Sequence, residues 1–283
     1  ALDTESLDQM VDFYLERGAT GLTILGMMGE AGKLTADVSA TVITRSCARA
    51  TVPVVVGVSA PGFAAIESLS ALAMDKGAAG VMVAPPSSLR TDREIRTYYR
   101  TVAGRLGDIP WVLQDFPLVT GVKIDPDVIL GIVADCPRCV MLKHEDWPGL
   151  EKIAALRAAS DSGARRISIL CGNGGLFLLE EMIRGADGAM TGFAYPEMMA
   201  SVVDLMTSRN EDRARDIFDA YLPLIRYESQ PGLGLAIRKY ILAKRGAIRH
   251  PTVRAPGPKL SRATIDEIEA LITRQNARLS DLG

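Results

Sequence analysis

The sequence of 283 residues predicts an α/β fold in which parallel strands alternate with helices, and two observations carry this prediction. One is a recurring phrase of a basic residue, Gly-Ala-x-Gly and a short apolar run, which begins at residues 17, 76 and 184. Its first glycine suits the left-handed position after a helix, and its apolar run suits a buried strand. The other is the regular spacing of apolar runs, which begin near residues 21, 53, 80, 110, 139, 167 and 188. Such intervals are typical of strand–helix units of roughly thirty residues.

The helices that should precede these strands are visible in the spacing of apolar residues. Behind a capping Asp3 or Thr4, apolar side chains recur three and four positions apart at Leu7, Met10, Val11 and Tyr14. The second phrase is preceded by the same pattern at Ile66, Leu69, Leu72 and Ala73. The strands are continuous apolar runs, such as PVVVGV from residue 53 and CVMLK from residue 139. Continuous rather than alternating runs indicate strands that are covered on both faces.

Seven strands separated by helices favour a (β/α)8 barrel over residues 1–207, with a doubly wound open sheet as the alternative. A barrel of this class has eight strands, and the chain opens directly in a helix. We therefore expect that the first strand is absent from this chain, or that the barrel is open or completed in another way. Only helical patterns follow Tyr195, at residues 197–207, 212–227, 234–244 and 261–282, with a proline-containing loop at 248–259. Residues 208–283 are predicted to form a C-terminal helical domain.

The composition is that of a globular protein and argues against several classes of function. Lys plus Arg number 32 and Asp plus Glu number 34, so the net charge of −2 removes the usual electrostatic argument for nucleic acid or an anionic membrane. The apolar runs are shorter than the roughly 20 residues of a membrane helix. Cys136 and Cys139 lack further clustered ligands, so we expect no metal and no cofactor. No basic-plus-apolar leader opens the chain, which predicts a cytoplasmic protein.

Lys143 stands at a predicted strand end, and in such barrels the active site lies at the C-terminal ends of the strands. It closes the run 140–142, and alternation places it on the same face as Met141. Apolar walls destabilise the charged ammonium, and a neutral amine attacks a ketone to form a Schiff base that withdraws electrons from the adjacent carbon. The alternative is a lysine that points to solvent or pairs with Glu145 or Asp146.

Glycine-rich loops at two other strand ends offer backbone N–H donors. Residues 26–30 follow the first visible strand and could bind a carboxylate, while residues 172–175 could bind a carboxylate or a phosphate. The alternatives are a tight turn at 172–175 and a helix N-terminal charge at Glu30. No Lys or Arg lies within 172–175, which argues against phosphate. The strand-end residues that we expect to contact the substrate are Met27, Met28, Gly29, Ser59, Gly172, Asn173, Thr191 and Gly192.

The order of these segments resembles the dihydrodipicolinate synthase / N-acetylneuraminate lyase superfamily of class I aldolases over essentially the whole chain. Residues 26–30 match its G-[TS]-T-G-E loop, residues 114–117 and the following Thr-Gly resemble its Y-N-x-P…T-G segment, and residues 188–192 are similar to its G-x-x-G stretch beside the pyruvyl pocket. Lys143 falls where the family has its Schiff-base lysine. The resemblance implies a barrel with a C-terminal helical domain, a 2-keto acid substrate, and a homo-oligomer that is a tetramer or a dimer.

Departures from the family pattern narrow the resemblance to one branch. The tyrosine that relays protons in the family is Gln114 here, and an amide cannot act as an acid or a base. The two loop threonines are Met27 and Met28, and a tyrosine pair is replaced by Ser87 and Ser88. These losses argue against the synthase and sialic-acid lyase activities. The Gln-Asp-x-Pro variant and the phrases at 222–225 and 228–230 resemble the branch that contains 2-keto-3-deoxy-L-arabinonate dehydratase.

The resemblance therefore implies a dehydratase for a 2-keto-3-deoxy sugar acid. Lys143 would condense with the 2-keto group, the C3 proton would leave, and the C4 hydroxyl would depart as water. Loss of the tyrosine harms retro-aldol cleavage more, because cleavage needs a base on the C4 hydroxyl. The predicted catalytic residues are Lys143, Gln114, Asp115 and Glu145, and further candidate proton carriers are Ser59, Tyr195 and His144, the last placed by alternation on the other face. The alternatives are a pyruvate-dependent aldolase and a barrel that binds a keto acid without turnover.

Overall fold

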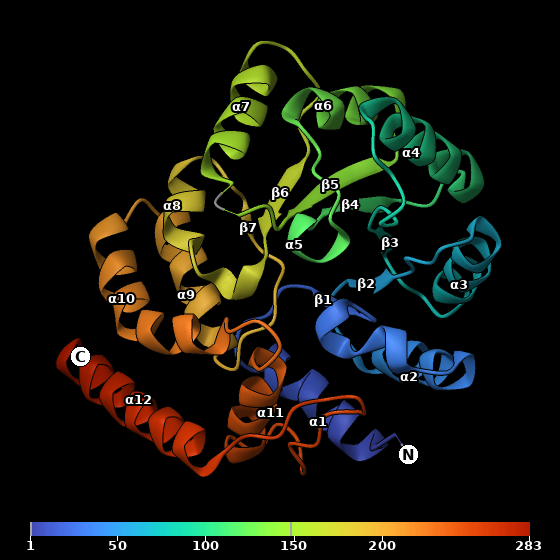
Figure 1. Ribbon diagram of the computed structural model, residues 1–283. Coiled ribbons are helices and arrows are strands. Elements are labelled where there is room, and N and C mark those ends of the chain that lie inside the picture. Colours follow the sequence, from blue (N-terminus) through green and yellow to red (C-terminus); the bar gives the residue numbers. More distant parts are fainter. Residues whose placement is uncertain (1, 148) are drawn as a thin grey trace.

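The computed structural model describes residues 2–147 and 149–283. Its centre is a seven-stranded parallel sheet in the order β1 to β7, which Figure 1 shows curled like part of a barrel. The strands are β1 Leu22–Ile24, β2 Val54–Gly57, β3 Gly80–Val83, β4 Trp111–Asp115, β5 Cys139–His144, β6 Ser168–Cys171 and β7 Gly188–Ala189. Neighbours in space are neighbours in sequence, so the order never reverses as it does in a doubly wound sheet. The predicted barrel architecture is confirmed, and β1 and β7 form the two edges of the sheet.

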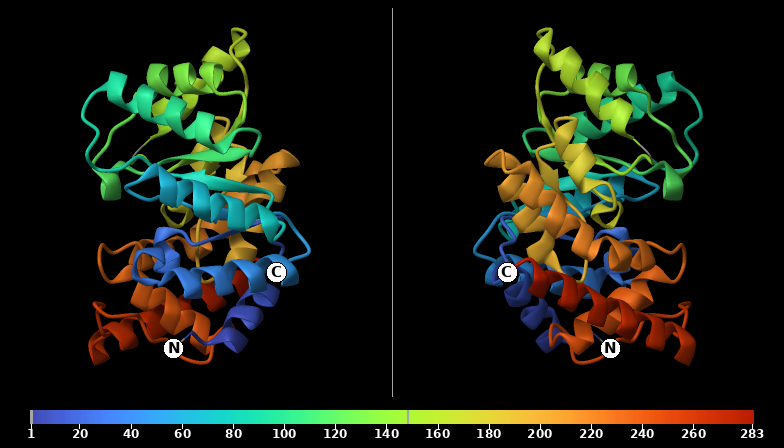
Figure 2. Two further views of the ribbon diagram at one scale, coloured as in Figure 1. Left: turned by 90° about the vertical axis from the view of Figure 1, so that its right-hand side faces the viewer. Right: turned by 90° about the vertical axis from the view of Figure 1, so that its left-hand side faces the viewer.

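Helices alternate with the strands, beginning with α1 before β1, and the longer ones cover the convex face of the sheet (Figure 1). They are α1 Thr4–Leu15, α2 Ala36–Arg49, α3 Phe63–Asp75, α4 Asp92–Leu106, α5 Pro117–Thr120, α6 Pro126–Asp135, α7 Leu150–Asp161, α8 Leu178–Ile183 and α9 Pro196–Thr207. Three more helices follow, α10 Glu211–Glu228, α11 Gly234–Lys244 and α12 Arg262–Asp281, within two residues of the predicted bounds. Figure 2 places α11 and α12 at the same end of the molecule as α1. Within the described residues, no helix combines the length and the apolar character needed to cross a membrane.

The recurring phrase ends a helix as predicted. Gly18, Gly77 and Gly185 have φ angles of 87°, 86° and 100°, a region in which glycine is favoured because a Cβ atom is penalised there. The residue after each of these glycines closes the helix end by bonding back five positions: the N–H groups of Ala19, Ala78 and Ala186 donate to Tyr14 O at 3.1 Å, Ala73 O at 3.0 Å and Glu181 O at 2.9 Å. The helices end at Leu15, Asp75 and Ile183, two or three residues before these glycines, and the next strand begins three or four residues after each glycine.

The two faces of the sheet bury different sets of side chains. The outer face packs against the helices, with Trp111 stacked on Tyr99 at 5.6 Å between ring centroids. The inner face is filled by a separate apolar cluster, the pore cluster, made of Val55, Met82, Val112, Met141, Leu170 and Met190. Since alternate residues of a strand face opposite sides, the residues two positions beyond Val112 and Met141 also face the pore. These residues are Gln114 and Lys143.

Candidate active site

Lys143 emerges above the pore cluster at the end of β5. It pairs in register with Gln114 of β4 on one side and Leu170 of β6 on the other. The residue is 9% exposed, so its side chain is buried at the end of the strand rather than extended into bulk solvent. The predicted face and burial of Lys143 thus agree with the structure.

Glu145 joins Lys143 and Gln114 through a single carboxylate oxygen. Its Oε2 lies 3.2 Å from the Lys143 Nζ atom and accepts a hydrogen bond of 2.6 Å from the Gln114 Nε2 group. Glu145 is 5% exposed, and its backbone is held on both sides: its N–H donates to Asp115 O at 2.8 Å, and its carbonyl accepts from the Asn173 side chain at 3.0 Å. The structure brings three of the four predicted catalytic residues together, with the carboxylate between the amine and the amide.

Gly172 makes room for this carboxylate. A Cβ atom at residue 172 would overlap the Glu145 Cγ atom and would lie 2.6 Å from its Cδ and Oε1 atoms. The backbone of Gly172 has a φ of −105°, so the requirement is for space and not for an unusual conformation. Gly172 was predicted as a substrate contact, and its visible role is close packing against Glu145.

The loops after β6 and β7 are joined across the mouth of the pore. The Thr191 hydroxyl accepts a hydrogen bond of 2.8 Å from Gly174 N–H. Asn173 has a left-handed φ of 49°, which is uncommon for a residue with a side chain and recurs at functional sites. Ser59, after β2, accepts a bond of 2.8 Å from Ala84 N–H after β3. The predicted substrate residues therefore tie neighbouring strand ends together.

The loop after β1 is a short helical turn at Met27–Gly29 that presents two exposed methionine side chains. The turn is entered through Leu25 with a φ of 53° and left through Glu30 with a φ of 58°. The Gly29 N–H donates to Gly26 O at 3.0 Å. The first N–H groups of a helical turn have no partner within it, so the N–H groups of Met27 and Met28 are not used inside the turn.

A comparison with protein families identifies the family of this chain. The model of the dihydrodipicolinate synthetase family matches residues 1–275. The chain belongs to this family. It is a Schiff-base-forming lyase of the class I type, and a keto-acid substrate fits the family's chemistry.

Individual relatives of the family align along nearly the full chain. L-2-keto-3-deoxyarabonate dehydratase of Azospirillum brasilense is 28% identical over 96% of this chain and 89% of its own length. The 4-hydroxy-tetrahydrodipicolinate synthase of Chlorobium luteolum is 29% identical over 95% and 90%. A crystal structure of dihydrodipicolinate synthase from Rhodopseudomonas palustris superposes with a TM-score of 0.94 and 54% identity, covering 96% of this chain and 91% of that one.

Asp115 and His144 lie on the outer face of the sheet, opposite to the face that carries Lys143. Asp115 is fully buried, and its Oδ2 atom accepts a bond of 2.7 Å from the Lys152 ammonium, which also contacts Asp146 at 2.7 Å. Burial raises the pKa of Asp115 to about 6, against the opposing effect of the Lys152 charge. Burial, followed by repulsion from Lys152, lowers the pKa of His144 to about 4. Alternation explains both positions, because these residues follow Gln114 and Lys143 by one place.

Two other predicted proton carriers have different surroundings. Tyr195 is buried beside Phe193 and Tyr221, and the Arg245 guanidinium lies 4.0 Å from the centroid of its ring. Ser59 is exposed at the end of β2. Within residues 2–147 and 149–283, no group of three or more His, Cys, Asp or Glu side chains is arranged to hold a metal ion.

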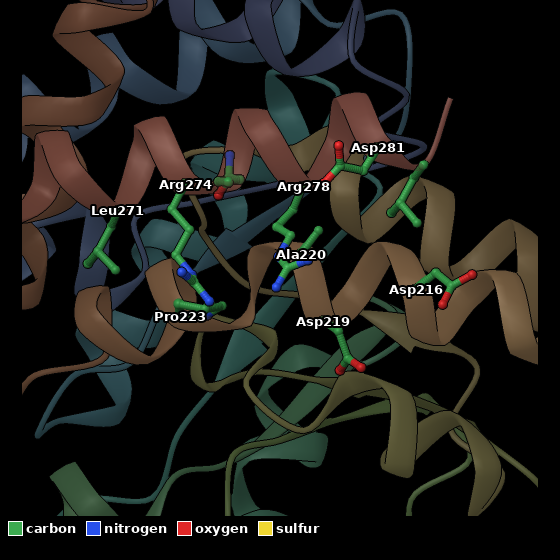
Figure 3. Close-up of a pocket in the computed structure, with 10 residues that line it drawn as sticks. Asp216, Asp219, Ala220, Pro223, Leu271, Arg274, Arg278 and Asp281 are labelled. Carbon is green, nitrogen blue, oxygen red and sulfur yellow. The ribbon is translucent and has the colours of Figure 1, made fainter.

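A groove of about 320 Å³ lies elsewhere, between α10 and α12 (Figure 3). Its walls include Asp216 and Asp219 on one helix and Arg274 and Arg278 on the other. None of its lining residues belongs to a strand or to a strand-end loop. The groove is separate from the site built around Lys143.

The sequence did not identify two residues that border the site. Arg238 of α11 packs against Gly192, where any added side chain would overlap its Nη1 atom. Lys239 of the same helix donates a hydrogen bond of 2.7 Å to Glu30. Both contacts join segments that are far apart along the chain, so no local sequence pattern predicts them. The place of Arg238 at the site is revealed only by its contact with Gly192 in the folded structure.

Proposed function

We propose that this protein is a dehydratase that forms a Schiff base between Lys143 and a 2-keto-3-deoxy sugar acid. The observation that carries the proposal is the place of Lys143, which is buried at the end of β5 above the apolar pore cluster. The pairing of Lys143 with Glu145, which the sequence analysis gave as the alternative to a nucleophilic role, is present at 3.2 Å, and we propose that this carboxylate takes the proton of the lysine. The name of the Azospirillum brasilense relative supports the substrate class. Lys143, Glu145 and Gln114 are the proposed catalytic group.

In the first step the amine attacks the C2 ketone of the substrate, and the resulting carbinolamine loses water to give an iminium ion. A base must take a proton from the attacking nitrogen, and an acid must protonate the departing oxygen. Glu145 is within hydrogen-bonding distance of the Lys143 nitrogen and is therefore placed to move this proton in both directions.

In the second step the iminium ion accepts the electron pair released when a C3 proton leaves. The enamine that results pushes electrons back and expels the C4 hydroxyl, which takes up a proton and leaves as water. This step needs an acid beside C4 and no base on the C4 hydroxyl. Gln114 supplies neither, but its amide N–H fixes the Glu145 carboxylate at 2.6 Å. Glu145 is proposed to take the C3 proton and to return a proton to the departing C4 hydroxyl, and a water molecule then hydrolyses the imine, which frees the product and the Lys143 amine.

The substrate carboxylate is proposed to bind at the strand-end loops. The donors are the backbone N–H groups of Met27 and Met28, with Gly29 shaping the turn and Thr191 and Gly192 on the opposite wall. Backbone donors at the start of a helical turn suit an anion. Methionine side chains stand where the family has threonines, so no hydroxyl of this turn is present and backbone N–H groups are the proposed donors to the substrate carboxylate.

The experiment that tests this function combines trapping with product analysis. Borohydride reduction in the presence of pyruvate should add one pyruvyl group to Lys143, located by peptide mass spectrometry, and the Lys143→Arg variant should add none. Incubation with a panel of 2-keto-3-deoxy acids should give a product that has lost one water. Release of pyruvate and an aldehyde would instead identify an aldolase, and saturable binding with neither product would identify a non-catalytic keto-acid-binding barrel.

We also propose that the protein is a homo-oligomer. Large apolar side chains are exposed at Leu118 and Val119 of α5 and at Ile183 of α8, and exposed apolar surface of this kind is typical of protein interfaces. Light scattering of the purified protein should give the mass of a dimer or a tetramer. A monomer mass across the accessible concentration range would rule the proposal out.

A further inference from the structure

Helix α11 contacts the strand-end loops at both edges of the sheet. β1 and β7 are those edges, so each has only one strand as a neighbour in the seven-stranded sheet. Consecutive residues of α11 face different loops: Arg238 lies against the loop after β7, and Lys239 lies against the loop after β1. Figures 1 and 2 show α11 beside α1, at the end of the molecule where the two edges approach each other.

Arg238 contacts the loop after β7 at Gly192, and its guanidinium also forms a buried ion pair with Glu228. Arg238 and Glu228 are 7% and 3% exposed, and the Arg238 Nε atom donates to Glu228 Oε1 at 2.5 Å. The guanidinium lies so close to Gly192 that its Cζ atom would be 3.2 Å from an added Cβ. A buried charge pair tolerates little displacement, since moving one partner leaves the other unpaired. The Gly192 backbone is therefore held against a rigid surface.

The contact with the loop after β1 is a carboxylate whose two oxygens are both engaged. Glu30 Oε2 accepts from Lys239 Nζ at 2.7 Å, while Oε1 accepts from Lys33 Nζ at 3.2 Å and from Arg254 N–H at 2.9 Å. Glu30 is buried and sits in the left-handed region, which persists in a residue with a Cβ only when its surroundings determine it. These hydrogen bonds to Glu30 therefore fix the position of the adjoining turn at Met27–Gly29.

We propose that Arg238 and Lys239 are positioning residues, and that α11 is a brace that sets the separation of the two loops that bind the substrate carboxylate. The proposal rests on the proposed function for its effect on substrate affinity. The brace itself is a statement about two loops and can be measured without turnover. Neither side chain needs to touch the substrate, because each acts through the backbone that it holds.

The test uses three single variants of the full chain: Arg238→Met, Lys239→Met and, as a matched control, Lys244→Met. Lys244 lies on the same helix and pairs with Glu269 at the surface, remote from both loops. Two quantities are measured in each variant. One is the pyruvate concentration that gives half-maximal borohydride trapping at Lys143, and the other is amide hydrogen exchange in residues 26–30 and 190–194.

We expect Arg238→Met to speed exchange in residues 190–194 and Lys239→Met to do so in residues 26–30, with Lys244→Met like the wild type. The pyruvate concentration for half-maximal trapping should rise by roughly ten-fold or more in both brace variants, while the maximal trapping rate changes less. The reason is that small displacements of binding groups reduce the reaction up to ~10²-fold. Arg238→Lys should recover part of the affinity by restoring the charge. Unchanged exchange in both loops of folded brace variants would overturn the proposal.

A second perturbation covers the case in which Arg238→Met fails to fold. Gly192→Ala keeps both charges of the ion pair and pushes the guanidinium away from the loop. It should loosen residues 190–194 and weaken trapping in the same way, and wild-type exchange in that variant would contradict the brace. If the wild type traps no pyruvate at all, the proposed function fails, and the exchange measurements still decide whether α11 braces the loops.

Discussion

The Glu145 Oε2 atom lies 3.2 Å from the Lys143 Nζ atom, and both side chains project from one three-residue segment at the end of β5. In the family resemblance the proton relay is a tyrosine on the neighbouring strand, where this chain has Gln114. We propose that the acidic group here is Glu145, two residues after the lysine, and that the Gln114 amide positions it through its hydrogen bond of 2.6 Å. This arrangement leads to predictions that separate the roles of the three residues.

Glu145→Gln should keep the shape of the site and remove the proton carrier. We expect the rate of borohydride-trappable imine formation with pyruvate to fall on the order of 10²-fold, in the range that general acid–base groups contribute. Glu151→Gln is the control, because that carboxylate lies on the surface of α7 in an exposed pair with Arg184. Imine formation within two-fold of the wild type would mean that Glu145 does not move the proton.

Gln114→Tyr should restore a titratable hydroxyl at the pore wall. Since retro-aldol cleavage needs a base on the C4 hydroxyl, we expect the ratio of released pyruvate to dehydration product to rise with 2-keto-3-deoxy acids. Gln114→Leu is the companion variant, because it removes the donor to Glu145 without adding a hydroxyl and should lower dehydration without raising pyruvate release. An unchanged product ratio in the tyrosine variant would show that residue 114 does not control the reaction type.

Gly172→Ala should disturb Glu145 directly. The added methyl would overlap the Glu145 side chain, and overpacking of a buried site costs about 1–3 kcal/mol in the free energy of unfolding. Gly104→Ala is a matched control within α4, where an added Cβ meets nothing within 4 Å, and it should be neutral or stabilising by up to about 1 kcal/mol. Urea unfolding measures both, and the activity losses of Gly172→Ala and Glu145→Gln should be less than additive when combined.

Asp115→Asn should reveal a hidden dependence of stability on pH. His144 has a folded-state pKa of about 4 against 6.5 unfolded, so the unfolded chain binds more protons and stability rises with pH between these values. Asp115 has a folded-state pKa of about 6 against 3.8 unfolded, so its contribution falls with pH over nearly the same window. Each effect is on the order of 3 kcal/mol at about 1.4 kcal/mol per pKa unit, and they oppose each other.

The wild type should therefore show a nearly flat unfolding free energy between pH 4 and 6.5 from this pair, and the Asp115→Asn variant should become more stable as pH rises. Chemical unfolding at several pH values measures the slope. Asp108→Asn is the control, because the Asp108 carboxylate is almost fully exposed in its pair with Arg138. A variant slope equal to that of the wild type would argue against opposed titrations behind the sheet.

Much of the architecture could be predicted from the sequence because its signals are local. The Gly-Ala-x-Gly phrase marks a helix end and a strand start within a few residues, and all seven strands were placed by such runs. Alternation along β5 also placed Lys143 with Met141 and sent His144 to the opposite face, as the structure confirms. The same rule applied to β4 separates Gln114 from Asp115, so the outward position of Asp115 follows from the strand register.

The rest of the site depends on contacts that no local pattern contains. Glu145 lies one residue beyond the last strand residue, so strand alternation does not predict the direction of its side chain. The side chain can lie on the pore side because Gly172 leaves space for it. The bonds from Lys239 and Arg254 to Glu30 span more than two hundred residues of chain. Such pairings are set by the packing of whole helices and become visible only when the fold is assembled.

Lys143 at the end of β5 and Glu145 one residue beyond it belong to one short stretch of chain, which has a consequence for how the site can vary. The proposed nucleophile and the proposed proton carrier come from this single stretch, whereas the turn after β1 and the connections after β3 and β4 come from other parts of the chain. Substitutions in those connections can therefore change which keto acid is accepted while the pair that is proposed to form the imine stays in place.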